Sequence, residues 1–199
     1  RVVARYPADV TRLLDRRERK QMALANLRAA FPDLKEAEIR RILRNVYRHF
    51  SEAVVDSANV SRRAARGDYE GLFELEGFEK VRDVPEGRGI IFVTGHFGQF
   101  EVLGLASPLI GLPVWSIARD TSNPYLARHV RRMRQSSGQK TLEKEDSWRE
   151  VLRLLRRGEH TALLIDQDAR RKGIFVDFFG RPASTAPSAG RLAVYTGSP

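Results

Sequence analysis

The sequence predicts an α/β fold, with a mainly parallel central sheet flanked by helices and a helical hairpin at its N-terminal end. Apolar residues recur at helical spacing over residues 10–60, and beyond residue 70 short apolar runs alternate with longer amphipathic ones. Strands that alternate with helices are typical of βαβ units, in which neighbouring strands run parallel. Because 42% of the 199 residues are hydrophobic, we expect one core and a single domain over 1–199, comprising a helical entry (1–60) and an α/β part (70–199).

The helical hairpin is interrupted by Phe31, Pro32 and Asp33, a proline-containing break after which the helical pattern resumes over residues 34–55. The first arm is strongly basic. A basic helix is either a solvated surface or a face that binds anionic lipid headgroups, and the pattern alone leaves both interpretations open. The basic residues of this arm are Arg12, Arg16, Arg17, Arg19 and Lys20.

The alternation beyond residue 70 gives a definite order of elements. Short apolar runs predict strands at 72–75, 89–94, 113–118 and 161–165. Amphipathic runs predict helices at 100–109, around 124–135 and 147–157, and near 187–196. In parallel sheets of this kind, ligands bind at the loops that follow the carboxyl ends of the strands. Residues that can do chemistry are therefore expected in these loops.

The charge and cysteine content limit the classes of function. The formal net charge is +10, which favours an anionic partner such as a phospholipid surface, a phosphorylated substrate, an acidic protein or a nucleic acid. The absence of cysteine excludes disulfides, thiol catalysis and thiolate metal ligands. No apolar run reaches the roughly 18 to 20 residues that a transmembrane helix needs. We expect the chain to be part of a longer protein that continues at both ends.

His96 follows the strand predicted at 89–94 and lies in a glycine-flanked turn, with Glu101 in the first turn of the next helix. If the histidine is in the turn and the carboxylate on the helix, the carboxylate can bind one ring nitrogen and leave the other free as a base. Of the four histidines, only His96 is followed five residues later by an acid. The alternative interpretation is a hydrogen-bonded structural histidine.

A second polar cluster follows the strand predicted at 161–165 and begins with Asp166 and Gln167. It continues through a basic stretch at 170–172 into an aromatic loop at 174–185. This order of residues suits a polar headgroup that lies beside acyl chains. The alternative is a polar turn followed by an ordinary core segment.

Two segments, GHFGQFEVLG and DQDARRKGIFVDFFGRPASTAPSAGRLA, resemble the two signature blocks of the lipid A biosynthesis acyltransferases. This family is a branch of the lysophospholipid acyltransferase superfamily with a glycerol-3-phosphate acyltransferase-like fold. The segment between the blocks, with Arg119, Asn123 and the helix that carries Arg134, is also similar, as is the N-terminal segment LRAAFPDLKEAEIRRILRNVYRHF. The sequence departs from the family where Gln99, Phe100 and Asp168 replace asparagine, tryptophan and asparagine, which leaves fine substrate preference open.

The resemblance implies roles for individual residues. His96 would be the general base with Glu101 as its partner, and Arg134 would be a cation that anchors the substrate or stabilises the transition state. Asp166 would be a supporting polar residue. The full set of expected substrate-binding residues is Arg119, Asn123, Arg134, Asp166, Gln167 and Arg181.

The activity implied is transfer of an acyl chain from acyl carrier protein to a hydroxyl of a lipid A precursor or related glycolipid, without metal or other cofactor. An acyl-CoA donor, with a phosphatidylinositol mannoside or a lysophospholipid as acceptor, is the enzymatic alternative. A nucleic-acid-binding domain is disfavoured because the basic residues are dispersed and no nucleic-acid motif is present. The expected location is the cytoplasmic face of the bacterial inner membrane, with the protein peripheral or anchored by a segment outside this chain.

Overall fold

The computed structural model describes residues 17–118, 124–143 and 147–199. The described residues form two compact units. The helical unit contains the described residues up to Asp56 together with Asp177–Arg181, and the sheet unit contains those from Ser57 to Val176 and from Pro182 to Pro199. Each unit is described by itself.

The helical unit contains α2 (Arg17–Ala30) and the first part of α3 (Glu36–Ala64), so the predicted pair of helices is confirmed. The break between them has a defined local structure. The Glu38 carboxylate accepts the backbone N–H of Lys35 at 3.1 Å, which satisfies one free donor at the start of α3. Arg28 reaches across the break to Glu36 with an N–O distance of 2.9 Å. Arg12 and Arg16 of the basic arm lie outside the described residues.

The sheet unit is built on four parallel strands in the order β1-β4-β2-β3. The predicted fold class, a parallel sheet flanked by helices, is therefore confirmed. Strand β4 lies between β1 and β2, so it has a strand neighbour on each side. The strands are β1 (Ile91–Thr94), β2 (Val114–Ala118), β3 (Lys140–Glu143) and β4 (His160–Leu164).

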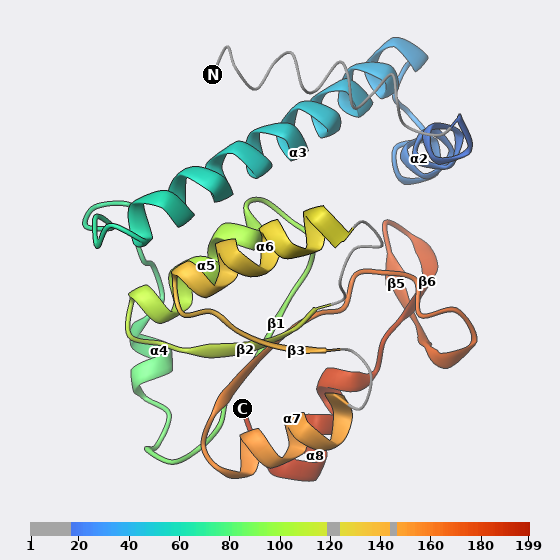
Figure 1. Cartoon of the computed structure of the whole chain (residues 1–199). Helices are drawn as coiled ribbons and strands as arrows, with labels where there is room; N and C mark the ends of the chain where they lie inside the picture. Colours follow the sequence, from blue (N-terminus) through green and yellow to red (C-terminus); the bar gives the residue numbers. More distant parts are fainter. Residues whose placement is uncertain (1–16, 119–123, 144–146) are drawn as a thin grey trace. The chain divides into compact units, whose positions relative to one another are not determined.

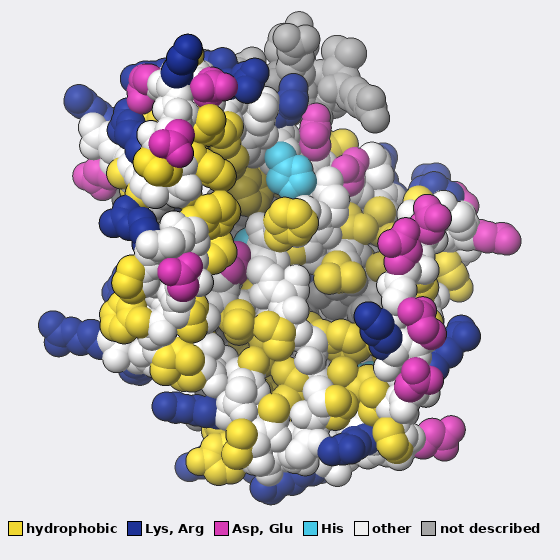
Figure 2. All heavy atoms as spheres, turned by 180° about the vertical axis from the view of Figure 1, so that it is seen from behind, with side chains coloured by type: hydrophobic (Ala, Val, Ile, Leu, Met, Phe, Trp, Pro, Cys, Tyr) yellow, Lys and Arg dark blue, Asp and Glu magenta, His cyan; other side chains and the backbone are white. Residues whose placement is uncertain are grey.

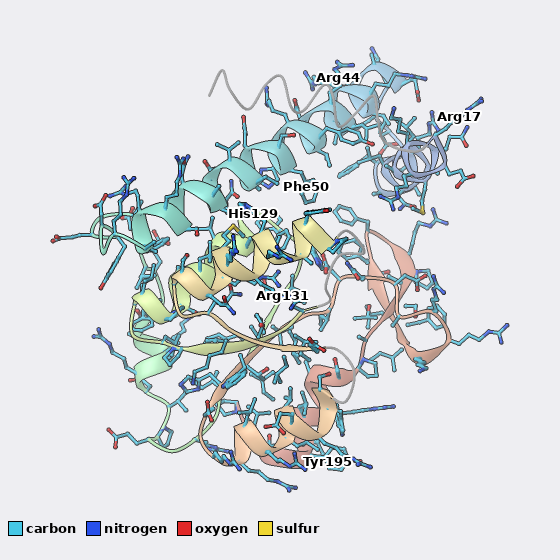
Figure 3. All side chains as sticks on the ribbon, viewed as in Figure 1. Arg17, Arg44, Phe50, His129, Arg131 and Tyr195 are labelled. Carbon is cyan, nitrogen blue, oxygen red and sulfur yellow. The ribbon has the colours of Figure 1, made fainter. Side chains whose placement is uncertain are left out.

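Helices cover both faces of this sheet, α5 and α6 on one face and α7 and α8 on the other (Figure 1). The core beneath α7 and α8 includes Leu155, Leu163 and Leu192, each at most 5% exposed. Figure 3 shows Tyr195 on the side of α8 that faces away from the sheet, where its ring meets Trp148 of α7 edge to face. The helices are α5 (Phe100–Leu109), α6 (Pro124–Ser136), α7 (Ser147–Arg156) and α8 (Ser188–Thr196), with the short α4 (Glu79–Arg82) before the sheet.

Three parts of the predicted element order differ from the structure. Residues 72–75 were expected to be a strand but have no strand partner, and Leu75 is 48% exposed. The edge strand β3 was missed because its sequence, KTLE, is short and mostly polar. The aromatic loop contains a two-stranded sheet formed by β5 (Ile174–Phe178) and β6 (Arg181–Thr185), preceded by the 3₁₀ helix η1 (Arg170–Lys172).

His160, the first residue of β4, connects this strand to the chain that enters β1. Its Nδ1 accepts the backbone N–H of Ile90 at 3.2 Å, which requires an unprotonated nitrogen. Burial lowers the pKa of His160 below its ordinary value, while the neighbouring Glu159 carboxylate opposes this effect. The folded protein therefore favours the neutral imidazole.

This lowered pKa predicts a pH dependence of stability. Below the ordinary histidine pKa of about 6.5 the unfolded chain binds a proton that the folded chain resists, so the free energy of unfolding falls as the pH decreases through this region. His160→Asn keeps an acceptor near the position of Nδ1 but does not titrate. We expect the variant to lose less stability than the unmodified protein between pH 7.5 and pH 5.5, as measured by urea unfolding. Equal losses would contradict the prediction.

Candidate active site

The candidate active site lies where β1 and β4 end. The two strands are parallel neighbours in a register that pairs Thr94 with Leu164, and the Ile165 N–H continues the ladder to the Thr94 carbonyl at 3.1 Å. His96 and Asp166 each lie two residues beyond these paired positions. Parallel pairing therefore brings residues that are distant in sequence to the same edge of the sheet.

His96 and Asp166 make two hydrogen bonds there. His96 Nδ1 lies 2.8 Å from Asp166 Oδ1, and the backbone N–H of His96 donates to Oδ2 of the same carboxylate at 2.7 Å. A carboxylate at Nδ1 favours the tautomer with the proton on that nitrogen, which leaves Nε2 as an acceptor. Burial raises the pKa of Asp166, but the hydrogen bonds from the His96 side chain and backbone outweigh it, so the pKa lies below its ordinary value.

Neighbouring residues restrict the turn and the position of the ring. A Cβ on Gly95 would lie 3.0 Å from Asp166 Oδ2, so the close approach of the carboxylate depends on glycine. Gly98 has a φ of +57°, a conformation that side chains disfavour. The Phe100 ring contacts the His96 imidazole edge to face, with centroids 4.9 Å apart. The turn therefore leaves the imidazole little freedom to rotate.

Gln167 follows Asp166 and lies on the other side of the imidazole. Its Nε2 is 3.5 Å from His96 Nε2, at the limit of a hydrogen bond. An amide at this distance can move aside when a hydroxyl approaches the same nitrogen. The structure thus brings the predicted substrate-binding residue Gln167 next to the expected base.

Glu101 binds a partner other than the one expected. Its carboxylate oxygens accept Arg134 Nη2 at 2.6 Å and Nε at 3.4 Å, in an ion pair that joins α5 to α6. The side chains of Arg134 and Glu101 are only 16% and 28% exposed. The expected hydrogen bond from Glu101 to His96 is therefore corrected: Asp166 holds Nδ1, and Glu101 holds the guanidinium. The physical reason is that β4 places a carboxylate directly against the turn, while the first turn of α5 faces α6.

The remaining predicted residues lie apart from this arrangement. Arg119 and Asn123 lie outside the described residues. Arg181 is the exposed first residue of β6 and belongs to the helical unit, and its role stays a prediction. Within the described ranges, no group of three or more histidine, aspartate or glutamate side chains could hold a metal ion. No helix among these residues is long and apolar enough to cross a bilayer.

Two features of the site were missed by the sequence reasoning. The pairing of His96 with Asp166 needs β4 as the neighbour of β1, and sequence periodicity carries no information on strand order. The edge-to-face packing of Phe100 on the imidazole was not anticipated either. From the sequence, Asp166 is expected only as a supporting polar residue and Phe100 only as a departure from the family pattern.

A sequence profile of the bacterial lipid A biosynthesis acyltransferases matches residues 2–199, so the chain belongs to this family. A lipid A biosynthesis acyltransferase of Haemophilus influenzae is 23% identical over 179 residues, which cover 89% of this chain and 56% of that protein. The lipid A biosynthesis myristoyltransferase of Escherichia coli is 24% identical over 179 residues, with coverages of 87% and 54%.

A second lipid A biosynthesis acyltransferase of Haemophilus influenzae is 30% identical over 174 residues, which cover 82% of this chain and 52% of that protein. The chain therefore spans about half the length of the curated relatives it matches. The resemblance inferred from the two signature segments is confirmed at the level of the family.

Proposed function

We propose that the protein transfers a fatty acyl chain from a thioester donor to a hydroxyl group of a lipid A precursor or a related glycolipid. The observation that carries the proposal is the His96 imidazole, bound at Nδ1 by Asp166 and located at the ligand-binding edge of a parallel sheet. An imidazole oriented in this way is suited to act as a general base towards a hydroxyl. Membership of the acyltransferase family supports this choice of reaction.

In the proposed reaction, His96 Nε2 accepts the proton of the acceptor hydroxyl as its oxygen attacks the thioester carbonyl carbon. A tetrahedral oxyanion forms and collapses, the C–S bond breaks, and the leaving thiolate takes the proton from the imidazolium. The acyl group passes directly to the acceptor oxygen, and the chain has no cysteine that could carry it as a thioester.

The two carboxylates have separate roles in this mechanism. Asp166 fixes the ring of His96 and stabilises the imidazolium that forms when the base accepts a proton. Glu101 holds Arg134 along the edge of the guanidinium formed by Nε and Nη2. A planar guanidinium has a second edge that can bind a phosphate or a developing oxyanion. Arg134 is therefore proposed to anchor the substrate or to stabilise the transition state.

The role of Arg134 predicts a difference from the neighbouring arginines of α6. Arg134→Lys keeps the charge but loses the fork that binds Glu101 and an oxygen together, so we expect kcat/KM to fall by about 10- to 100-fold at every ionic strength. The matched control, Arg132→Ala, removes an exposed charge and should weaken turnover only at low salt. Initial rates with the same donor and acceptor across ionic strength measure both. Equal, salt-sensitive losses of kcat/KM in Arg134→Lys and Arg132→Ala would mean that Arg134 contributes only its charge, like the exposed arginines of α6.

The donor is proposed to be acyl carrier protein, with acyl-CoA as the alternative. Acyl carrier protein is acidic, and α6 presents three exposed arginines, Arg128, Arg131 and Arg132, that would steer such a partner. The acceptor is proposed to be a phosphorylated glycolipid, because phosphate suits arginine recognition. The proposed location is the cytoplasmic face of the bacterial inner membrane, with peripheral attachment or an anchor outside this chain.

The proposal is tested by supplying the full-length protein, in membranes, with matched acyl carrier protein and acyl-CoA donors. Lipid A precursors, phosphatidylinositol mannosides and lysophospholipids serve as acceptors in parallel. Formation of an acylated lipid A precursor supports the proposal, and a faster reaction with acyl-CoA and another acceptor supports the alternative. The absence of acyl transfer to every acceptor, by protein that retains its fold, would refute the function.

A further inference from the structure

The strand β5 lacks the buried face that strands normally have. Every one of its residues is exposed, and the sequence IFVDF places apolar side chains on both faces. Within the sheet unit, Phe175 is 74% exposed and Ile174 is 53% exposed. Consecutive apolar residues left in water on a short strand are unfavourable unless another phase or partner covers them.

A basic turn immediately precedes this strand. The three residues of η1, Arg170, Arg171 and Lys172, are all exposed. The turn is held by local hydrogen bonds: Ser184 Oγ donates to the Arg170 carbonyl at 2.7 Å, and the Arg170 N–H donates to Asp168 Oδ1 at 2.8 Å. The Ala169 N–H also bonds the Ser184 carbonyl at 3.0 Å. The charges are thus presented by an ordered turn rather than by a loose tail.

We propose that residues 170–176, called the basic–apolar segment below, insert into the interface of an anionic bilayer. Ile174, Phe175 and Val176 enter the boundary between headgroups and acyl chains, while the preceding arginines and lysine bind phosphate groups. This inference deepens the proposed function and rests on it, because a lipid acceptor is most easily reached where the enzyme touches the membrane. The segment begins four residues after Asp166, on the chain that leaves the candidate active site.

The chemistry of the segment favours a lipid surface over an acidic protein. Aromatic and aliphatic side chains next to Arg and Lys are the composition of elements that lie in the membrane interface. Figure 2 shows hydrophobic side chains beside dark-blue Lys and Arg side chains along the left margin, the side on which β5 and β6 of Figure 1 lie after the half-turn between the two views. An acidic partner surface would neutralise the basic charges, but it would leave the side chains of Ile174, Phe175 and Val176 without an apolar environment.

Flotation with vesicles tests the proposal on the full-length protein. Phosphatidylcholine vesicles with and without phosphatidylglycerol are used, because only the mixture is anionic. Ile174→Ser with Phe175→Ser is expected to lower the apparent partition coefficient on the mixed vesicles at least about tenfold, since two apolar side chains no longer enter the interface. Arg171→Gln with Lys172→Gln should weaken binding to the mixture and leave binding to phosphatidylcholine nearly unchanged.

Matched controls lie elsewhere on the sheet unit. Val194→Ser removes an apolar side chain that is 85% exposed on α8, and Arg156→Gln with Arg157→Gln removes the same charge from the region of α7. Both controls are expected to bind like the unmodified protein. Equal binding by the segment variants and the unmodified protein would overturn the proposal. If the segment variants instead lost binding to acyl carrier protein while their binding to vesicles stayed unchanged, the partner of the segment would be an acidic protein.

The failure of this inference can be distinguished from failure of the proposed function. Turnover is measured in detergent micelles, where no bilayer is needed, and flotation is measured on the His96→Ala variant, in which turnover is expected to be strongly reduced. Normal turnover in micelles with unchanged flotation of the segment variants overturns the membrane segment alone. Normal flotation without turnover by the unmodified protein overturns the acyltransferase function alone.

Discussion

Replacing His96 with alanine is expected to lower the rate of acyl transfer by about 10² to 10⁴ while the fold is retained, because general-base catalysis contributes a factor of this size. The side chain is one-third exposed and lies in a turn rather than in the core, so its removal should cost little stability. The loss should appear mainly in kcat, since the base acts as the hydroxyl attacks. Single-turnover rates with a saturating thioester donor measure it.

His129 provides the matched control for this experiment. It lies on α6 with its side chain exposed (Figure 3), and His129→Ala should leave the single-turnover rate within about twofold, as expected for an exposed residue outside the reacting centre. Circular dichroism of both variants establishes that the fold is intact. Near-normal turnover by a folded His96→Ala protein would remove His96 from the mechanism and with it the main support for the proposed function.

Asp166→Asn is expected to be nearly as damaging as the loss of His96, with a rate lower by about 10² to 10⁴. The amide can donate a hydrogen bond to Nδ1, which would move the ring proton to Nε2 and leave the base without a free lone pair. This is a change of tautomer rather than of fold. Nitrogen-15 NMR of the labelled imidazole reports which ring nitrogen carries the proton, a signature that a purely structural role of Asp166 would not change.

Glu101→Gln is the control for Asp166→Asn, because each replacement removes the negative charge of one carboxylate. It deletes the other carboxylate, which in the structure holds Arg134, so the tautomer of His96 should stay as in the unmodified protein. We expect kcat/KM to fall by about 10- to 100-fold, because the guanidinium loses its charged partner and its fixed orientation. The reverse outcome, a changed tautomer in Glu101→Gln and an unchanged one in Asp166→Asn, would return the orienting role to Glu101.

The sequence was sufficient to predict the parallel sheet and most of its helices. The turn after β1 was recognisable because an apolar strand ends in Gly95 and His96, and α5 was predicted with the bounds observed, Phe100–Leu109. Local patterns of this kind depend on side chains that are close together in the sequence. The edge strand β3 escaped detection because an edge needs fewer apolar residues.

The partner of His96 could not be found in the same way. Spacing along the chain favoured Glu101, since a turn followed by a helix brings the two residues close. Asp166 is distant in sequence and meets His96 only because β4 was inserted between β1 and β2. The order of the strands depends on how the whole sheet packs. No single segment of the sequence determines it.

The two hydrogen bonds between Asp166 and His96 have a consequence for how the protein would lose the proposed activity. The Asp166 carboxylate binds both the backbone N–H and the ring of His96, and the two residues follow the ends of different strands, β4 and β1. The orientation of the base is therefore coupled to the local opening equilibrium of the β1–β4 pair. We expect conditions that separate these strand ends to release the imidazole even while the buried contacts of α7 and α8 persist, so that activity is lost through local opening before the sheet unit unfolds as a whole.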